Sequence, residues 1–459
     1  KVVILVSNMV KRDDEEFLNV SKTSPTKKHK FLKLQNCKRV LHPTNGTLYD
    51  AGFIVIDVTL GIIVQIEKNA SRNTIDINLS QNAHAPTEGV NNIEFLDCEG
   101  FILSPGFIDV QVNGAYGVDF SNPKLTTDEV LKVSSFLPKH GVTTFCPTLV
   151  SSSRETYRKV RPIIIPFVEE MQNKSIDTCC TNNTTFTASH HEKGAKIAGM
   201  HLEGPFFQKK KRGAHSLAHI LDDLTEKDVI ENTYGIKRSI GKNHGISIIT
   251  LAPELLGAMD VIEDLSVNKG IVVSIGHCDA TLEQGKEALK RGAKMVTHLY
   301  NAMNPFHHRE PGLLGLLLDN CNVDSTHNGC NGGSEPTLYQ GIIADGIHSH
   351  PTSVKIAHRL NSRGMVLVSD SISAMGLGDG KHTLGTMEVE IKSNKATVKN
   401  GANKNTLAGS VVSIDTCIRN YMAFTKCSHG EALVAATMHP AEILQSKSFR
   451  GAISIGRKA

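Results

Sequence analysis

The sequence lacks a strong charge of either sign. Lys and Arg number 50 and Asp and Glu 46, so the formal net charge is only +4 over 459 residues. The basic residues are scattered, whereas a nucleic-acid-binding protein usually gathers them in a patch or stripe. The composition therefore gives no reason to expect a nucleic acid as partner.

Two further absences concern the compartment. The ten cysteines form no Cys-x-x-Cys motif and no regular spacing of a small disulfide-rich domain, which favours free thiols in a reducing compartment. The apolar start, KVVILVSNMV, is too short to span a bilayer and lacks a small-residue cleavage site. We therefore expect a cytoplasmic protein with no membrane partner.

The first 104 residues predict an extension followed by short strands. Residues 1–28 end in the polar, lysine-rich segment SKTSPTKKHK, which is typical of a flexible extension. Residues 29–104 contain strand-like runs bounded by Asn-Gly and Gly turns, namely FLKLQNCKRVL, AGFIVIDVTLGIIVQIEK and IEFLDCEGFILSPG. These runs predict a small module of antiparallel strands.

From residue 105 the pattern changes to repeated strand-helix units. Eight units over roughly 270 residues are the usual length of a TIM barrel. A doubly wound sheet is the alternative, but no Gly-x-Gly-x-x-Gly follows an early strand to support it. Polar insertions at 176–193 and 320–335 predict loops outside the barrel. The eight predicted strands are Gly106–Val110, Val142–Phe145, Ile197–His201, Ile246–Leu251, Ile271–Ile275, Lys294–Thr297, Gln340–Ala344 and Met365–Ser369.

Three elements are predicted after the barrel strands. Residues 382–401 resemble a hairpin, residues 414–444 a pair of amphipathic helices, and residues 451–459 the start of another strand.

The stretch from residue 270 to 315 contains two histidines at matching places. Each follows an apolar run, His277 after VVSIG and His298 after KMVT. A helix between the runs, with Asp279 or Thr281 as N-cap, would complete a strand-helix-strand unit with parallel strands. Residues after the carboxyl ends of such strands face one site. A lone histidine is more often structural, but two at equivalent positions favour a pair of metal ligands.

Other predicted strands also end in polar residues. They are Gln111 and Asn113, Glu203, Asp345 with His348, and Asp370. One Glu and two His form a known set of catalytic zinc ligands that leaves a position open for water. A divalent metal lowers the pKa of bound water towards about 7 and can polarise an amide carbonyl. Asp370, on another strand, would suit the proton transfer. The structural alternatives are a capping or salt-bridge role for Glu203 and a surface position for Asp370.

Two basic segments leave alternatives open. Arg309, in HHREPG, could bind a phosphate through its planar fork or form a salt bridge with Glu310. The lysines of KKKRGAHS (209–216) are better explained as a solvated loop. His215, at the end of that segment, lies on the same predicted loop as Glu203.

A series of motifs resembles a known family. They are LSPGFIDVQVNGAYGVDFS, GMHLEGPF, RGAHS, TLAPE, VSIGHCDAT, THLYNAMNPFHHREPG, IADGIHSHP, VLVSDSISAMGLG and TLAGS. In this order they closely resemble the N-acetylglucosamine-6-phosphate deacetylases of the amidohydrolase superfamily, above all the animal type. The resemblance covers about residues 95–445 and is weaker from about residue 29.

The resemblance implies a fold and a reaction. The fold is a TIM barrel (105–445) with a β-sandwich from both ends of the chain (29–104 and 446–459). The reaction is hydrolysis of N-acetyl-D-glucosamine 6-phosphate by a homodimer. The family continues past GRKA, so the second sandwich segment is expected to be truncated.

The resemblance also implies roles for individual residues. Glu203, His277 and His298 would bind the metal, Asp370 would be the acid/base, and His215 would polarise the acetyl carbonyl. Arg309 or His348 would reach the phosphate from the neighbouring subunit. The implied substrate contacts are Ala214, His215, Asn301, Ala302, Arg309, Asp345, Gly346, Ile347, His348, Leu407, Ala408 and Gly409.

One departure concerns the number of metals. Most amidohydrolases carry His-x-His after the first strand, but this chain has Gln111 and Asn113, vestiges of a second metal position. We expect one divalent metal per subunit, with Zn²⁺ preferred and Fe²⁺ or Co²⁺ as alternatives.

Two other functions stay open. One is a different mononuclear amidohydrolase acting on a related acylated amino sugar, which a substrate panel would distinguish. The other is an inactive scaffold, which metal analysis of the purified protein would distinguish.

Overall fold

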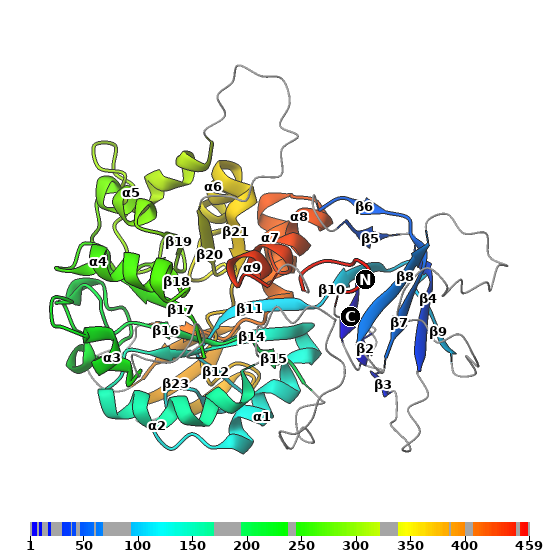
Figure 1. Ribbon diagram of the computed structural model, residues 1–459, viewed down its shortest axis with the longest axis horizontal. Coiled ribbons are helices and arrows are strands. Elements are labelled where there is room, and N and C mark those ends of the chain that lie inside the picture. The colour runs from blue at the N-terminus through cyan, green and yellow to red at the C-terminus, as the bar shows by residue number, and fades with distance from the viewer. Residues whose placement is uncertain are drawn as a thin grey trace. The chain divides into compact units, whose positions relative to one another are not determined.

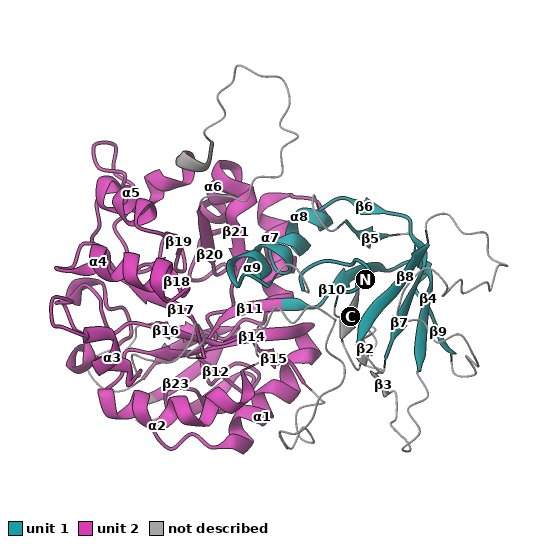
Figure 2. Cartoon of the chain, in the orientation of Figure 1, with its two compact units in different colours: residues 1–107, 429–459 teal, residues 108–428 magenta. Residues whose placement is uncertain are grey.

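The computed structural model describes residues 2–6, 9–11, 17–19, 30–37, 39–42, 46–58, 61–67, 93–168, 194–236, 245–321, 338–384, 387–399, 407–446 and 450–457. The chain divides into two compact units, one formed by residues 1–107 and 429–459 and the other by residues 108–428 (Figure 2). The polar insertion predicted at 176–193 lies outside the described residues, as does most of the one at 320–335.

The larger unit is built on a parallel barrel sheet (Figure 1). The strands follow chain order around the sheet, and the pairs from β14 to β21 are parallel. A bridge between Val112 and Ser371 joins the last strand region to the first, and the Asp370 N–H donates to the Gln111 carbonyl at 2.9 Å. The predicted TIM barrel is therefore confirmed. Its strands are β11 (Phe107–Val112), β14 (Val142–Val150), β16 (Met200–Glu203), β17 (Ile246–Leu251), β18 (Val272–Ile275), β19 (Ala293–Val296), β20 (Tyr339–Ile342) and β21 (Met365–Leu367), with β15 (Lys196–Ile197) beside β14.

Helices connect the barrel strands. Between β18 and β19 runs α5 (Leu282–Lys290), whose N-cap is Thr281. The Thr281 hydroxyl accepts from the Gln284 N–H, and the Gln284 side chain accepts from the Thr281 N–H, a reciprocal capping box that satisfies two free amides. The other helices of this unit are α1 (Thr127–Phe136), α2 (Arg154–Ile164), α3 (Val229–Tyr234), α4 (Ala258–Glu263), α6 (Pro351–Asn361) and α7 (Ile414–Thr425).

A chain of hydrogen bonds crosses the barrel interior. Burial lowers the pKa of His201 to about 4, so its ring is neutral. Its Nδ1 lies 2.9 Å from the Val110 carbonyl and must carry the proton, so Nε2 accepts from the Thr250 hydroxyl at 2.7 Å. Thr297 therefore donates to Thr250 at 2.8 Å, and Ser274 donates to Thr297 at 2.6 Å. These hydrogen bonds hold strands β16 to β19 against one another below the site.

A second sheet in the larger unit includes the predicted hairpin. β23 (Met387–Lys392) and β24 (Lys395–Val398) are joined by Ser393 and Asn394, with φ of 52° and 64°. Positive φ at both positions suits a two-residue hairpin turn. β22 (Gly380–Leu384) and β25 (Leu407–Ser410) complete this sheet.

Residues 414–444, which were predicted as a pair of helices, form three helices in the structure. α7 is followed by α8 (His429–Val434) and α9 (Met438–Ile443). Pro440 explains the break, because proline has no N–H and fits only the first turn of a helix. A new helix therefore begins at Met438.

The described residues of the smaller unit form two sheets. One has the order β8-β7-β4-β9 and the other β3-β2-β1-β10-β5-β6. Buried side chains from both sheets, such as Leu34, Ile54 and Leu103, share one core. Their bounds are β1 (Val2–Val6), β2 (Met9–Lys11), β3 (Phe17–Asn19), β4 (Phe31–Cys37), β5 (Val40–Leu41), β6 (Leu48–Tyr49), β7 (Gly52–Asp57), β8 (Ile62–Glu67), β9 (Ile93–Asp97) and β10 (Ile102–Pro105).

Three expectations for this unit are corrected. The strands are not all antiparallel, because β4 pairs with β9 in parallel; the long connection between β8 and β9 allows this crossover. Residues 1–28 include three strands, since the β-branched run VVILV pairs with β10. Residues 450–457 form turns and no strand, and the Gly456 N–H donates to the Ile63 carbonyl.

Among the described residues, none of the helices combines the length and apolar character that crossing a membrane requires.

Candidate functional site

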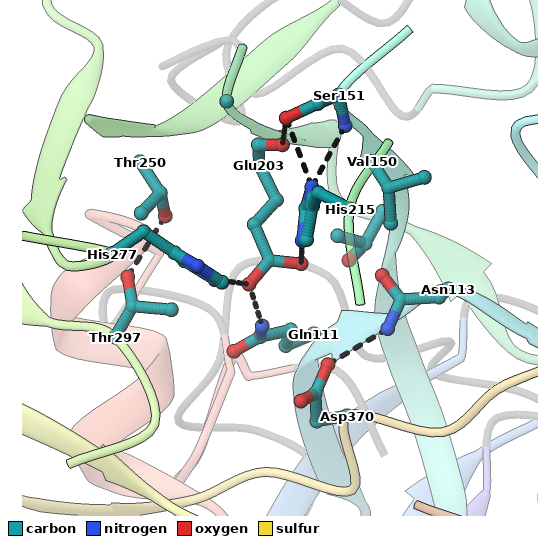
Figure 3. Close-up of polar contacts among 12 residues, drawn as sticks. Gln111, Asn113, Val150, Ser151, Glu203, His215, Thr250, His277, Thr297 and Asp370 are labelled. Atoms are coloured by element: carbon teal, nitrogen blue, oxygen red, sulfur yellow. Dashed lines mark hydrogen bonds and ion pairs between the residues drawn. The ribbon is translucent and has the colours of Figure 1, made fainter. Parts of the chain in front are cut away.

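Four residues predicted from the sequence lie at strand ends of the barrel, and Figure 3 shows three of them, Glu203, His277 and Asp370. Glu203 is the last residue of β16, and His277 and His298 lie two positions after β18 and β19. Asp370 lies three positions after β21. His277, His298 and Asp370 have positive φ values of 49°, 27° and 48°. Such backbone costs about 1–3 kcal/mol per residue and often occurs where a side chain must be aimed at a site.

The three predicted metal ligands converge on one point. Nε2 of His298 lies 3.0 Å from Glu203 Oε1 and 3.0 Å from His277 Nε2. Nε2 of His277 lies 3.4 Å from Glu203 Oε1. A tetrahedral metal with bonds of about 2.0–2.1 Å separates its ligand atoms by about 3.3 Å. The spacing of these three buried donors therefore fits one small divalent cation.

The proton positions show which histidine nitrogens are free to bind a metal. Nδ1 of His277 lies 2.8 Å from the Lys211 carbonyl, which can only accept. Nδ1 therefore carries the proton, and Nε2 presents its lone pair to Glu203 and His298. A backbone carbonyl that fixes the tautomer in this way is typical of a metal-binding histidine.

His215 lies in the same cluster but in the opposite tautomer. Donor atoms of Glu203, His215 and His277 lie within 4.8 Å of one another, so His215 competes with His298 as third ligand. However, the Ser151 N–H donates to His215 Nδ1 at 3.1 Å. Nε2 of the neutral ring must then carry the proton, and it lies 3.9 Å from Glu203 Oε2. His215 is therefore placed as a hydrogen-bond donor rather than a metal ligand.

The cluster shifts the pKa values of its members. Burial alone would raise the pKa of Glu203, but its contacts with His277 and His298 outweigh burial and hold the pKa well below 4.5. Burial opposes protonation of His298, yet its contact with Glu203 raises its pKa. Burial lowers the pKa of His277, and burial with the charge of His277 lowers that of His215 to about 3. The site thus has one firmly ionised carboxylate beside two neutral imidazoles, those of His277 and His215, whereas the contact with Glu203 favours the protonated form of His298.

Asp370 faces the cluster from the loop after β21. Burial, followed by the charge of Glu203, raises its pKa to about 7. The Asn113 side chain donates to Asp370 Oδ1 at 2.7 Å (Figure 3). One oxygen is therefore held in place, and the group can gain or lose a proton near neutral pH.

Gln111 makes the corresponding contact with Glu203. Its Nε2 donates to Glu203 Oε1 at 2.7 Å. The side-chain oxygens of Gln111 and Asn113 are buried and have no hydrogen-bond partner among the described residues. The two amides thus meet the two carboxylates through N–H donors.

The predicted substrate loop after β20 is held by Asp345. Its Oδ1 accepts the N–H groups of Ile347 and His348 at 2.8 Å each, and its Oδ2 accepts from His348 Nδ1 at 2.6 Å. The carboxylate is therefore used within the loop, and His348 is the member whose Nε2 stays available.

The structure brings Arg309 into contact with none of the cluster residues. Arg309 is exposed, and no carboxylate of a described residue lies within ion-pair distance of its guanidinium. Glu310, its predicted alternative partner, instead accepts the N–H groups of Leu282 and Gly312 at 2.8 and 3.1 Å. The salt-bridge interpretation is therefore not supported within the described residues.

Other predicted contacts lie on loops or on β25. Asn301 donates to the His298 carbonyl, and the Ala302 carbonyl accepts from the Cys278 N–H. Ala214 is exposed beside His215. Residues Leu407, Ala408 and Gly409 lie in β25, and Gly346 is exposed at a φ of 75°.

Sequence reasoning missed two groups of the site. Ser151 holds His215 and directly follows β14, so its strand-end position was an available signal. Phe207 stacks on His277 with ring centroids 4.1 Å apart, and nothing in its sequence context indicates that contact.

Comparisons with known proteins agree with this geometry. The profile of the Amidohydrolase family matches residues 102–459. The chain is 42% identical to the N-acetylglucosamine-6-phosphate deacetylase of Bos taurus over 364 residues, 79% of each chain. It is 40% identical to that of Caenorhabditis elegans over 370 residues, again 79% of each. The crystal structure of the deacetylase of Thermotoga maritima superimposes with a TM-score of 0.66 at 28% identity, covering 93% of both chains.

Proposed function

The chain belongs to the amidohydrolase family and, within it, to the N-acetylglucosamine-6-phosphate deacetylases, and on this premise we propose that it hydrolyses N-acetyl-D-glucosamine 6-phosphate to D-glucosamine 6-phosphate and acetate. The observation that supports this most directly is the convergence of Glu203, His277 and His298 at 3.0–3.4 Å beside Asp370.

The metal would be bound by Glu203, His277 and His298. Amidohydrolases are metal-dependent, and one carboxylate with two imidazoles suits Zn²⁺, with Fe²⁺ or Co²⁺ as alternatives. When bound, a divalent cation supplies a water nucleophile at neutral pH and polarises the acetyl carbonyl.

His215 would bind the acetyl oxygen. Its Nε2–H is fixed by the Ser151 N–H on the other ring nitrogen. A positioned donor of this kind stabilises the negative charge that develops on the carbonyl oxygen as it is attacked.

Asp370 would move the proton. Its Oδ1 is held by Asn113, so its other oxygen would accept the proton of the attacking water and return it to the leaving nitrogen. Asp370→Asn should lower turnover by about 10²–10⁴-fold while zinc content stays that of the wild type. Unchanged turnover in a zinc-loaded Asp370→Asn protein would contradict this role.

Gln111 and Asn113 would replace a second metal by two hydrogen bonds. Each donates an N–H to a carboxylate, Gln111 to Glu203 and Asn113 to Asp370. An amide could bind a cation only through its oxygen, and amide oxygens suit Zn²⁺ less well than imidazole nitrogens, which agrees with one metal per subunit.

The substrate phosphate would be bound by Arg309 and His348. Arg309 is exposed, and His348 is held by Asp345. Arg309→Ala should raise KM for the phosphorylated sugar much more than KM for N-acetylglucosamine. Equal changes for both sugars would remove Arg309 from this role.

The remaining substrate contacts would come from three loops and one strand. We propose that Asp345 acts through His348 rather than on the sugar. The other proposed contacts are Ala214, Asn301, Ala302, Gly346, Ile347, Leu407, Ala408 and Gly409.

A homodimer in the cytoplasm is proposed from the family resemblance. Light scattering after gel filtration would test the dimer, and fractionation of cells would test the compartment. Cys37, Cys98, Cys278 and Cys417 are free thiols, as expected where thiols stay reduced.

The decisive assay measures amine and acetate released from N-acetylglucosamine 6-phosphate by the zinc-loaded protein. A panel with other acyl groups and the unphosphorylated sugar tests a related amidohydrolase function. Absence of stoichiometric zinc after expression in zinc-rich medium would instead favour an inactive scaffold.

A further inference from the structure

His277 is bonded twice to the segment that carries His215. The Gln208 N–H donates to the His277 carbonyl at 3.0 Å, and His277 Nδ1–H donates to the Lys211 carbonyl at 2.8 Å. Both partners belong to the turn around η4 (Lys209–Lys211). The position of this short turn therefore decides where the His277 ring points and which of its nitrogens carries the proton.

Lys211 differs from the two lysines before it. Its Nζ lies 3.3 Å from Asp279 Oδ1 and 3.3 Å from the Met303 carbonyl, and its side chain is 22% exposed. Lys209 is 52% exposed and pairs with Asp222 at the surface, and Lys210 is exposed. The prediction of a solvated loop is therefore wrong for Lys211.

One acceptor of the Lys211 ammonium, Asp279, is itself held by its backbone. The Asp279 N–H donates to Glu254 Oε1 at 2.6 Å, and the Asn304 side chain donates to the Asp279 carbonyl at 3.1 Å. Lys211, Glu254, Asp279 and Met303 follow β16, β17, β18 and β19 respectively. One ammonium thus connects the loops after β16, β18 and β19, and the Asp279 N–H joins the loop after β17 to them.

We propose that Lys211 is a positioning residue for His277: its ammonium anchors the turn so that its own carbonyl holds the His277 Nδ1 proton and leaves Nε2 free for the metal. The proposal rests on the proposed function, because it takes His277 as a metal ligand. The same anchor sets the start of the segment in which the His215 N–H donates to the Arg212 carbonyl.

The test compares zinc affinity of the full chain with and without the anchor. Lys211→Met keeps the length of the side chain and removes the ammonium, and Lys210→Met makes the same change one residue away. After removal of metal with a chelator, zinc is titrated against a competing indicator. Losing partners that orient a metal ligand typically weakens affinity 10–100-fold, so we expect Lys211→Met to raise the zinc Kd about 10-fold. Lys210→Met should leave it at the wild-type value.

Two further measurements distinguish the positioning of His277 from a general effect on stability. The thermal midpoint of the metal-free protein should be similar in both variants, because a partly exposed ion pair contributes little to stability. Lys211→Arg, which can reach the same two acceptors, should restore most of the affinity. A folded Lys211→Met protein with wild-type zinc affinity would overturn the proposal.

Two other outcomes are informative. If Lys211→Met does not fold, Asp279→Asn must give the same weakening, and wild-type affinity in folded Asp279→Asn would overturn the proposal. If the wild-type protein itself binds no zinc, the proposed function fails and this inference fails with it. Tight binding by the wild type and Lys211→Met alike removes only the role of Lys211.

Discussion

Replacing Asn113 by Ala removes the only side-chain donor that holds Asp370 among the described residues and leaves the barrel backbone unchanged. The bond from Asn113 Nδ2 to Asp370 Oδ1 is 2.7 Å long, and Asn113 is 9% exposed. A hydrogen bond to a charged group contributes about 1.5–3 kcal/mol. If the proposed proton transfer needs the carboxylate in this orientation, kcat should fall by about 10- to 150-fold, since about 1.4 kcal/mol is tenfold. Zinc affinity should stay that of the wild type.

Gln111→Ala is the matched variant. It breaks a bond of the same length, but the acceptor is Glu203, a proposed metal ligand. We therefore expect the zinc Kd to rise about 10–100-fold, as for other partners that orient ligands. At saturating zinc, kcat should stay much closer to wild type than in Asn113→Ala.

The assay is steady-state kinetics at saturating zinc together with a zinc titration of each metal-free variant. If Asn113 acts on proton transfer and Gln111 on metal binding, Asn113→Ala must lower kcat and Gln111→Ala must lower zinc affinity. If both lower zinc affinity equally, or if Asn113→Ala leaves kcat unchanged, the assignment is wrong and the amides only fill space at the end of β11.

Two further expectations concern stability. Thr250→Val removes the hydroxyl that His201 and Thr297 contact at 2.7 and 2.8 Å, and leaving a buried acceptor unpaired should lower the free energy of unfolding by about 2–3 kcal/mol; urea unfolding with Thr250→Ser as control checks this, and an unchanged midpoint would contradict it. Burial raises the pKa of Asp109 from 3.8 to about 6. The contribution of Asp109 to the free energy of unfolding is therefore complete below pH 3.8 and is lost as the pH rises through 6. The free energy of unfolding of wild type minus that of Asp109→Asn should therefore fall by about 2 kcal/mol between pH 4 and 7, and pH profiles that run parallel would refute it.

The barrel could be predicted because its signal is local. Each strand is a short apolar run, each run ends in polar residues, and the carboxyl ends of parallel strands share one face. Glu203, His277, His298 and Asp370 could therefore be grouped before any coordinates were known. Their common face follows from chain order alone.

The partners of the amides could not be predicted in this way. Gln111 and Glu203 are 92 positions apart, and Asn113 and Asp370 are 257 positions apart. Strand ends place all four on one face, but which amide meets which carboxylate depends on side-chain directions around the closed barrel. For the same reason the sequence gives no means of distinguishing Lys211 from its two neighbours.

Positive φ occurs at site residues and at residues with no role in the site. Substitution by glycine should have different effects at the two kinds of position. Lys426 ends α7 in the left-handed region with a φ of 60°, is exposed, and its N–H donates to the Met422 carbonyl at 2.9 Å. The left-handed region costs a residue with a Cβ about 1–2 kcal/mol, and glycine regains this less about 0.5–1 kcal/mol of backbone entropy. Lys426→Gly should therefore raise the free energy of unfolding by about 0.5–1 kcal/mol.

Replacing His277, His298 or Asp370 by glycine would relieve the same backbone strain. It would also remove a side chain that the cluster needs. If urea unfolding finds Lys426→Gly less stable than the wild type, the left-handed backbone there is not strained. Backbone strain at the three site residues could then not be inferred from their positive φ values.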